Sequence, residues 1–396
     1  MKNKYVITEY KNKHLCAVYE DDVPVELIFA EKSEFSVGSI YIGRVDSILK
    51  NLNAAFVNIG PDVKGYLPMK NPDKFKVGAE IAVQIEKEAI KSKEIRLTED
   101  ISLGGHYLAI AKGRPGTGIS KKITDDEIRR SLKESFKTFI EEDDFLRDFF
   151  ANKGYGLVVR TAAAGADEEE LKKELKDLAG KLSDIEDYAD KRTVYSCLYM
   201  EEDAYFRRIR DAAGETERIV TDIPEIYQKC LDYFSDREEL TGVTALYKDE
   251  MLSLLKLYSL ETVIQEALQK KVWLRSGGFL VIEPTEALTV IDVNSGKNIK
   301  GKNKQKLIFE TNLEAVCETA RQLRLRNISG IIIIDFINMS SKEYQSELIS
   351  ELKKVLKKDR IESRFIDLTP LGLAELTREK IQKSLYEQIK KPEYVQ

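Results

Sequence analysis

The chain has 396 residues, of which 42% are hydrophobic and 33% charged, and its 63 Lys and Arg against 68 Asp and Glu give a net charge of −5. The length predicts two to four domains with an ordinary globular core, which excludes extended disorder and a collagen-like fold. No apolar run approaches the roughly 20 residues that a bilayer needs, and the N-terminus has the pattern of a polar strand and not of a signal peptide. We therefore expect a cytoplasmic protein without a membrane partner.

The cysteines and histidines restrict the possible chemistry. The four cysteines lie far apart without a CxxC pair, each in an apolar or mixed segment: Cys16, Cys197, Cys230 and Cys317. We expect buried reduced thiols instead of a disulfide framework or a cysteine zinc site. With only His14 and His106, a Ser-His-Asp triad or a His-based metal centre would have to recruit one of these two residues.

The N-terminal quarter is rich in strand patterns. Alternating residues predict three strands within residues 4–30, separated by turn-forming pairs, and this pattern indicates a meander. Five short runs follow between residues 38 and 98, with glycines at the bends. Five strands over such a length fit a small closed barrel.

The remainder is mixed. A glycine-rich loop at 113–118 leads to a helix at 125–140, and a strand at 156–160 precedes an amphipathic helix at 167–188. Strands and then helices are expected over residues 194–268. Beyond Trp273 an α/β alternation is expected, with strands at 279–283, 288–293, 330–336 and 362–367 and helices at 310–326, 341–358 and 371–387.

Two apolar strands that each end in an acid are the most informative feature. One is LTVIDVN at 288–294, and the other is GIIIIDFIN at 330–338. Four consecutive isoleucines predict a central strand that is buried on both faces. An ionised aspartate at the end of such a strand is costly unless it is paired or binds a metal.

Asp292 and Asn294 are two residues apart and share one strand face. Asp292 and Asp335 could therefore hold a hard cation while Asn294 orients one carboxylate. This all-oxygen ligand set favours Mg²⁺ or Mn²⁺ over zinc. The alternative is that the aspartates only cap helices or turns. A metal held by few protein ligands commonly serves phosphoryl transfer or phosphodiester hydrolysis.

Basic residues follow the first of these strands. Five lysines stand against one acid between residues 295 and 310: Lys297, Lys300, Lys302, Lys304 and Lys306. They are expected either to contact phosphates or to form a solvated surface run. Arg321, Arg324 and Arg326 close the next helix, where a helix dipole also favours cations.

Long segments of the chain closely resemble the ribonuclease E/G family. They are EALTVIDVNSG at 286–296, the segment from TNLEA to DFINM at 311–339, LGLAELTRE at 371–379, AAFVNIG at 54–60 and VVRTAAAGA at 158–166. The resemblance implies a catalytic unit that cuts single-stranded, AU-rich RNA internally and leaves a 3′-hydroxyl and a 5′-phosphate. It also implies Mg²⁺ held by Asp292 and Asp335, with Asn294 beside them. At the position of Asn338 the family more often has Asp.

The same resemblance implies two RNA-contacting regions. In an OB-type barrel, Phe56, Tyr66 and Lys93 match RNA-binding positions, although Phe56 could also be plain barrel core. In a domain that senses a 5′-monophosphate, Arg160 and Thr161 match the phosphate-binding pair, and Gly105 and Ala109 match positions that line the pocket. An arginine fork and a hydroxyl suit a phosphate, although an arginine at a strand end is often only a salt-bridge residue. Lys121 and Lys122 stand where the family often has paired arginines that contact RNA.

The implied fold is a multidomain α/β protein. Residues 1–37 and 200–268 would form an RNase H-like domain, into which the OB-fold barrel (38–99) and the sensor domain (100–199) are inserted. A DNase I-like catalytic domain would follow at 269–396.

Members of the family usually continue with a CPxCxGxG segment that shares zinc between protomers, followed by a small dimerisation domain. This chain ends at Gln396 without that motif. We therefore expect no structural zinc, and a homo-oligomer stays possible without the zinc link. Whether the chain is a natural short form stays open. The leading hypothesis is a Mg²⁺-dependent endoribonuclease of RNA processing and decay. The alternatives are an RNA-binding protein of the same fold with weak or no cleavage and a DNA-directed metal nuclease, which the RNA-type barrel disfavours.

Overall fold

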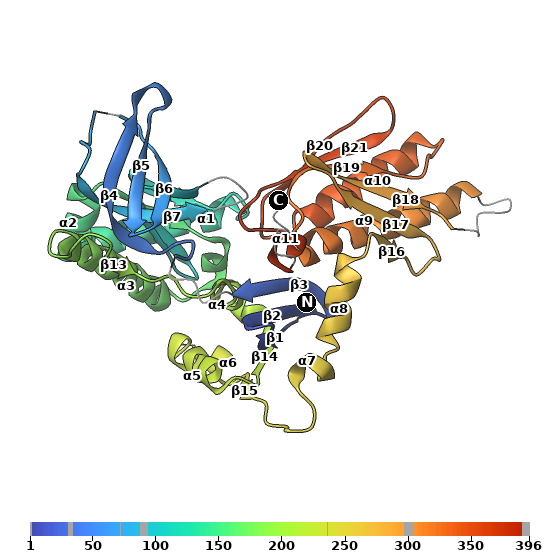
Figure 1. Cartoon of the computed structure of the whole chain (residues 1–396), viewed down its shortest axis with the longest axis horizontal. Coiled ribbons are helices and arrows are strands. Elements are labelled where there is room, and N and C mark those ends of the chain that lie inside the picture. Colours follow the sequence, from blue (N-terminus) through green and yellow to red (C-terminus); the bar gives the residue numbers. More distant parts are fainter. Residues whose placement is uncertain are drawn as a thin grey trace. The chain divides into compact units, whose positions relative to one another are not determined.

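A computed structural model describes residues 2–30, 35–71, 73–87, 94–235, 237–296 and 304–389. The chain forms two compact units, one of residues 33–203 and the other of residues 1–32 together with 204–396 (Figure 1). The first unit contains a barrel and a small mixed sheet, and the second contains two larger sheets. The multidomain α/β class is therefore confirmed, while the four predicted domain boundaries stay predictions.

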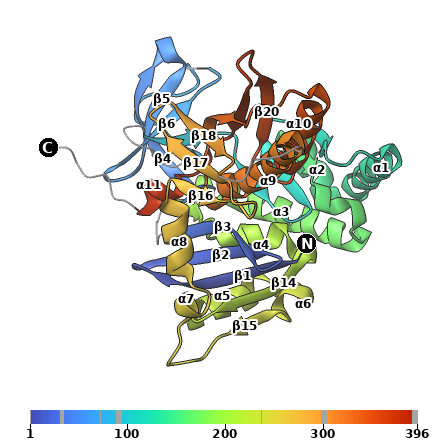
Figure 2. The same ribbon diagram turned by 90° about the vertical axis from the view of Figure 1, so that its right-hand side faces the viewer.

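The N-terminal meander is confirmed. The strands β1 (Asn3–Tyr10), β2 (Lys13–Glu20) and β3 (Val23–Ala30) pair in antiparallel order, and β14 (Thr216–Thr221) and β15 (Thr244–Leu246) extend the sheet beside β1 in parallel. The helices of this part are α4 (Ala204–Asp211), α5 (Pro224–Tyr233), α6 (Glu238–Thr241), α7 (Leu254–Leu257) and α8 (Leu260–Leu268). Alternate side chains of β1 serve two cores, because Ile7 packs with Phe206 of α4 while Val6 packs with Leu260 of α8. Figure 2 shows the helices α4 and α8 beside this sheet.

The predicted five-stranded barrel is also confirmed. Its strands are β4 (Ile40–Leu49), β5 (Ala54–Gly60), β6 (Val63–Pro68), β7 (Glu80–Lys87) and β8 (Ile95–Thr98). They pair in the order β4-β5-β6-β8-β7, and β7 pairs with β4 and closes the barrel. The close approach of strands explains Gly43, because a Cβ at this position would lie 2.5 Å from Cγ1 of Val57. The short strand β13 (Cys197–Tyr199) pairs with β4 outside the barrel.

The second sheet of this unit has the order β11-β12-β10-β9. It consists of β9 (Ser102–Gly104), β10 (Leu108–Lys112), β11 (Gly116–Ile119) and β12 (Tyr155–Val159), with helices α1 (Asp126–Glu142), α2 (Asp144–Asn152) and α3 (Glu168–Ala189). The prediction of a loop over 113–118 is wrong at its end, because residues from Gly116 pair in parallel with β12. The helix α2 was not predicted, although Asp143 caps it by accepting from the backbone N–H groups of Phe145 and Leu146.

The C-terminal sheet has the order β16-β17-β18-β19-β21-β20. Its strands are β16 (Lys271–Trp273), β17 (Phe279–Pro284), β18 (Leu288–Asn294), β19 (Gly330–Asp335), β20 (Ser363–Leu368) and β21 (Leu373–Arg378). The helices α9 (Lys304–Leu325) and α10 (Lys342–Leu356) cover one face, where Val316 and Leu348 pack against Ile291 and Ile334 (Figure 1).

Two predictions fail in this sheet. The predicted helix at 371–387 is instead the strand β21 followed by the short helix α11 (Leu385–Ile389). Along β21 buried residues alternate with partly exposed ones, the strand period of two, and Gly372 has a φ of 85° at the turn that precedes it. The isoleucines of β19 are not buried on both faces, because Ile332 and Ile334 are fully buried whereas Ile331 is 50% exposed. One face of the sheet is therefore open within this unit.

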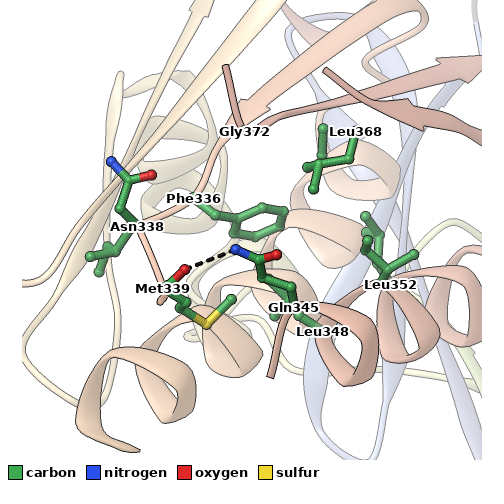
Figure 3. Close-up of a pocket in the computed structure, with 11 residues that line it drawn as sticks. Phe336, Asn338, Met339, Gln345, Leu348, Leu352, Leu368 and Gly372 are labelled. Carbon is green, nitrogen blue, oxygen red and sulfur yellow. Dashed lines mark hydrogen bonds between the residues drawn. The ribbon is translucent and has the colours of Figure 1, made fainter. Parts of the chain in front are cut away.

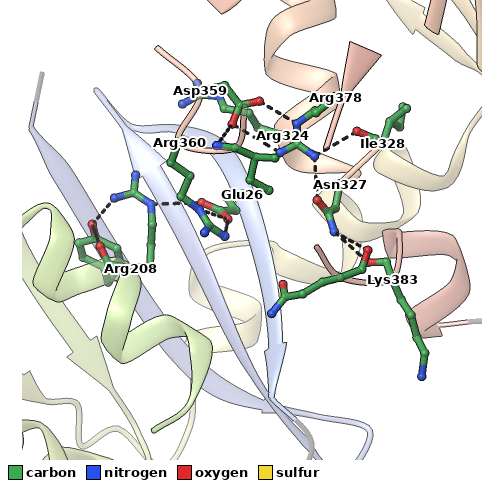
Figure 4. Close-up of polar contacts among 12 residues, drawn as sticks. Glu26, Arg208, Arg324, Asn327, Ile328, Asp359, Arg360, Arg378 and Lys383 are labelled. Atoms are coloured by element: carbon green, nitrogen blue, oxygen red, sulfur yellow. Dashed lines mark hydrogen bonds and ion pairs between the residues drawn. The ribbon is translucent and has the colours of Figure 1, made fainter. Parts of the chain in front are cut away.

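A partly buried polar network joins the two sheets of this unit. Glu26 of β3 accepts hydrogen bonds from Arg208 of α4 and from Arg360, which follows α10, at 3.1 and 2.7 Å (Figure 4). Burial opposes ionisation of Glu26, but the two guanidinium groups outweigh it and lower the pKa of the carboxyl to about 2. In the same region Arg378 of β21 pairs with Asp359 at 2.7 Å, and both side chains are buried.

The arginines at the end of α9 belong to the same packing. Arg324 makes a bidentate pair with Glu20 of β2 at 2.7 and 2.9 Å, and Arg321 donates to the carbonyl of Pro24. Arg326 is buried and donates to the carbonyl of Gln269. These arginines hold the end of α9 against its neighbours in the same unit.

The cysteine prediction is half right. Cys16 and Cys230 are buried thiols, whereas Cys197 and Cys317 are exposed, and all four are unbridged. Across the described ranges, every helix is too short or too polar to cross a membrane.

Candidate active site

The two aspartates lie side by side at the C-terminal ends of β18 and β19. These strands are parallel, and Asp292 stands directly opposite Asp335 in their register. Ile291 and Ile334, one residue earlier, point into the core beneath α9 and α10, so the two aspartates point to the open face. The sequence placed both acids at strand ends, and the structure brings them together.

Asn294 extends this arrangement along the same face. Its side-chain Nδ2 donates a hydrogen bond of 2.7 Å to Oδ2 of Asp292. The bond fixes the rotation of the Asp292 carboxylate. It engages Oδ2 and not Oδ1. This is the orienting contact that the spacing of two residues predicted.

An open cleft of about 590 Å³ surrounds the three side chains. It is lined by Asp292–Gly296, by Lys304 and Ile308 of α9, and by Asp335–Asn338. Within the part of the chain that the structure describes, neither aspartate forms an ion pair with a lysine or arginine. Lys304 is exposed at the first turn of α9, whereas Lys297, Lys300 and Lys302 lie outside the described residues.

The donor set suits a hard divalent cation. Two exposed carboxylates in adjacent register positions offer oxygen ligands, and no three His, Cys, Asp or Glu residues gather into a metal-ligating group in the described ranges. A cation held here would keep most of its ligands as water, which is the habit of Mg²⁺. The oxygen donors of Asp292 and Asp335 are therefore chemically compatible with the predicted metal.

Asn338 lies at the boundary between this cleft and a small apolar pocket. The pocket has a volume of about 40 Å³ between β19, α10 and the β20–β21 turn, and its lining includes Phe336, Gln345 and Leu348. Figure 3 shows the Asn338 carboxamide at the rim, directed away from Phe336 and Gln345. Asn338 also lines the cleft, so this position contributes an uncharged amide to the cleft lining.

A positioning residue was missed in the sequence. Asn312 of α9 is fully buried, its Nδ2 donates to the carbonyl of Ile337 at 2.8 Å, and its Oδ1 accepts from the N–H of the same residue at 3.1 Å. These two hydrogen bonds to the backbone of Ile337 fix the segment that follows Asp335. A lone asparagine on the apolar face of the helix was the available signal.

In the barrel, Phe56 and Tyr66 form one aromatic surface. They stand opposite each other on β5 and β6, with ring centroids 6.1 Å apart in an edge-to-face arrangement. Both are half-buried, whereas Ala55 and Val57 point into the barrel core. The reading of Phe56 as plain barrel core is therefore wrong.

Basic residues that the sequence did not single out surround this pair. Lys64 lies two residues before Tyr66 with its Nζ 5.8 Å from the centroid of the Phe56 ring, and Arg96 of β8 stands opposite Tyr66. Each makes an exposed ion pair, Lys64 with Asp46 and Arg96 with Glu86. Such pairs contribute little, so these cations can exchange their partners for phosphates. Lys93 lies outside the described residues.

The four predicted sensor residues gather at one end of the sheet of β9–β12. Arg160 follows β12, and its Nη1 donates to the carbonyl of Gly105 at 2.5 Å. Thr161 shares a hydrogen bond of 3.0 Å with Ser120, which directly precedes Lys121. Ala109 lies in β10, two residues beyond Tyr107, whose carbonyl accepts from the N–H of Arg160.

Glu174 of α3 supports this region and was missed. Its carboxylate accepts from the N–H groups of His106, Tyr107 and Leu108 at 3.0, 2.8 and 2.8 Å. A Cβ at Gly105 would lie 2.2 Å from Oε1 of Glu174, so only glycine permits this approach. Gly105 thus both accepts from Arg160 and admits the carboxylate.

Lys121 and Lys122 are exposed in the turn between β11 and α1. Arg129 of α1 fixes this turn by donating to the carbonyls of Ser120 and Ile123 at 2.7 and 3.0 Å. Neither lysine has an acidic partner in the described part of the chain. These two exposed lysines, which follow Ser120 in the chain, are thus available to an anion.

Fold and site together define a multidomain α/β protein with an OB-like barrel and a candidate hard-cation site. The model of the ribonuclease E/G family matches residues 102–381. Ribonuclease E of Synechocystis sp. is 35% identical over 412 residues, covering 99% of this chain and 59% of the relative. Ribonuclease G of Salmonella typhimurium is 32% identical over 372 residues, covering 88% of this chain and 74% of the relative. The chain belongs to the ribonuclease E/G family, and it spans about three-fifths of the length of the ribonucleases E of Synechocystis sp. and Nostoc sp..

Proposed function

We propose that this protein is an RNA-cleaving hydrolase, and more narrowly a Mg²⁺-dependent endoribonuclease of RNA processing and decay in the cytoplasm. Relatives named ribonuclease E and ribonuclease G support an endoribonuclease. The observation that carries the finer proposal is the register of Asp292 and Asp335 on the open face of their sheet. Mn²⁺ can take the place of Mg²⁺, because both accept carboxylate and water oxygens.

Each side chain at the cleft has a role in this reaction. Asp292 and Asp335 would hold the cation, and Asn294 would keep the Asp292 carboxylate in its ligating orientation through the 2.7 Å hydrogen bond. Lys304, at the margin of the cleft, would offset charge on the substrate phosphate. A bound divalent cation supplies polarisation of the phosphoryl oxygens and a water of lowered pKa. Hydrolysis would add water across the bond between phosphorus and O3′, which leaves a 5′-phosphate and a 3′-hydroxyl.

The barrel would bind the single-stranded substrate. Phe56 and Tyr66 offer aromatic faces, and every base can stack on such a face, so the choice of sequence stays loose. Lys64 and Arg96 beside them would contact the phosphates. The sensor residues Arg160 and Thr161 would bind a 5′-monophosphate, with Lys121 and Lys122 holding the adjoining strand.

The competing candidate is an RNA-binding protein of the same fold with weak or no cleavage. The observation that favours it is Asn338, which presents an uncharged amide to the cleft. A third candidate, a DNA-directed nuclease, would use the same carboxylates. A homo-oligomer is compatible with all of them.

One assay separates the three candidates. The protein is incubated with a 5′-monophosphorylated AU-rich oligoribonucleotide, and in parallel with the matching deoxyribonucleotide, with Mg²⁺ or with EDTA. The proposal expects internal cuts in RNA only, only with Mg²⁺, with 5′-phosphate and 3′-hydroxyl ends. Binding without cutting would establish the RNA-binding alternative, and cuts in DNA at a similar rate would establish the third candidate.

A further inference from the structure

Trp273 is the only tryptophan in the chain, and it is exposed. It lies in β16, at the edge of the C-terminal sheet, where 65% of its surface is accessible. Its neighbour Leu274 is buried in the core cluster of the sheet, and Val272 packs against that cluster, so these two residues anchor the segment. Tryptophan is enriched at interfaces, so an exposed one beside anchored neighbours is a candidate contact with a partner.

The strand register places Trp273 on the same face as the carboxylates. Trp273 stands opposite Phe279 of β17, and Phe279 stands opposite Asn294 of β18. Opposed residues of neighbouring strands point to the same face. Leu280, which follows Phe279 in β17, is fully buried on the face that α9 and α10 cover. Because successive residues of a strand point to opposite faces, Phe279 and Trp273 lie on the open face. Two strand spacings separate its backbone from Asn294, which is about 10 Å.

Lys271 completes a compact group with the two rings. Its Nζ lies 3.8 Å from the centroid of Trp273 and 3.7 Å from that of Phe279, and the two rings are 5.4 Å apart. This ammonium fixes the rings by cation–π attraction and adds positive charge to the group. Lys271 stands opposite Val281, which in turn stands opposite Asp292, so the same row of the sheet leads to the carboxylate pair.

We propose that Trp273, Phe279 and Lys271 form a base-stacking subsite for the RNA strand, on the same open sheet face as Asp292 and Asp335. This inference rests on the proposed function and deepens it. An unpaired base that flanks the scissile phosphate stacks on Trp273, while Lys271 contacts the adjoining phosphate. Aromatic faces beside a basic group bind single strands without reading their sequence. The subsite places the strand directly on the catalytic sheet, independently of the aromatic pair in the barrel.

The single tryptophan makes the subsite directly observable. The full-length protein is titrated in EDTA with a 2′-O-methyl oligoribonucleotide while the Trp273 fluorescence is recorded. Stacking is expected to quench the emission, and an abasic nucleotide scanned along the oligonucleotide should abolish the quenching at one or two positions only. A fully duplex RNA should quench little, because its bases are already stacked on one another.

Variants test the contribution to affinity. Trp273→Ala should weaken binding of a fluorescein-labelled oligoribonucleotide about fivefold to a hundredfold, and Trp273→Phe should retain most of the affinity. The matched control is Ile366→Ala, at an apolar residue that is 54% exposed on β20, the opposite edge of the same sheet. The control should bind like the wild type. Thermal melting confirms that each variant is folded.

The results that overturn the inference are distinct from failure of the proposed function. Unchanged emission at saturating RNA, or wild-type affinity of Trp273→Ala, would remove the subsite even if the protein cuts RNA normally. If the Trp273 emission changes with protein concentration in the absence of RNA, and sedimentation detects a dimer, the surface serves self-association instead. If RNA quenches the Trp273 emission as expected but the protein never cuts RNA, the subsite is retained and the proposed nuclease activity is rejected.

Discussion

Asn294 donates a 2.7 Å hydrogen bond to Asp292 from two residues further along the same strand. The bond fixes one carboxylate of a register-matched pair and occupies one of its oxygens. In the proposed metal site Asn294 would therefore act through Asp292.

Asn294→Ala should raise the Mg²⁺ concentration for half-maximal cleavage about 10- to 100-fold, because the Asp292 carboxylate loses its orientation. The measurement is a Mg²⁺ titration of the cleavage rate, with Ser295→Ala, at the next position of the cleft lining, as the control. An unaltered Mg²⁺ dependence would show that the hydrogen bond does not serve the metal.

Phe56→Ala and Tyr66→Ala should each weaken RNA binding by about 1 to 3 kcal/mol, the contribution of one stacked base. The exchanges Phe56→Tyr and Tyr66→Phe retain the ring and should bind almost normally. Affinities are measured by fluorescence anisotropy with an uncleavable oligonucleotide. If the alanine variants melt like the wild type and bind RNA equally well, the barrel aromatics do not contact the substrate.

Arg160→Ala should remove a preference for 5′-monophosphate RNA over 5′-hydroxyl and 5′-triphosphate RNA. A lost charge-assisted hydrogen bond contributes about 1.5 to 3 kcal/mol, roughly ten- to a hundredfold in rate. The slower cleavage of 5′-hydroxyl RNA should be retained, because Arg160 lies in a different unit from Asp292. Competition between the three substrates in one reaction gives the preference directly. Equal rates in the wild type would mean that this chain does not sense the 5′ end.

Glu26→Gln should lower the stability and change its dependence on pH. The pKa of Glu26 is lowered from 4.5 to about 2, so its ionisation stabilises the fold fully above about pH 4.5, and this stabilisation declines as the pH falls toward 2. Removing the charge leaves Arg208 and Arg360 without their carboxylate and should cost about 3 to 5 kcal/mol at pH 7. Denaturant unfolding at pH 7 and pH 3 is the measurement, and the variant should differ less from the wild type at pH 3. A constant difference at both pH values would contradict this account of Glu26.

The sequence predicted the strands well because their signal is local. The alternation within residues 4–30 and 38–98 depends on neighbours two apart, and it produced a meander and a closed barrel. The helix predicted over 371–387 failed because Leu373, Ala374 and Glu375 are good helix formers, whereas the pairing of β21 with both β19 and β20 decides the structure of this segment. Propensity is a weak prior where a sheet offers partners on both sides.

The candidate site could be predicted in part for the same reason. Asp292, Asn294 and Asp335 stand out because each breaks an apolar run, and parallel strands bring their ends together. Glu174 and Trp273 carry no such local signal, because their roles depend on which helix or strand packs beside them. The asparagine at 312 marks an apolar helix face, but its partner Ile337 could not be read from that position. The prediction that residues 331–334 are buried on both faces failed for a different reason, because hydrophobicity alone does not reveal that one face of a sheet is open.

The most direct test of the account is cleavage by Asp292→Asn and Asp335→Asn, with RNA binding measured on the same preparations. Each exchange removes one charged ligand and retains the shape of the side chain, while the core around Ile291 and Ile334 holds the strands. We predict that both variants bind an AU-rich oligoribonucleotide like the wild type and lose Mg²⁺-dependent cleavage. Near wild-type cleavage by either variant would contradict the assignment of the two aspartates as the metal ligands and the catalytic centre.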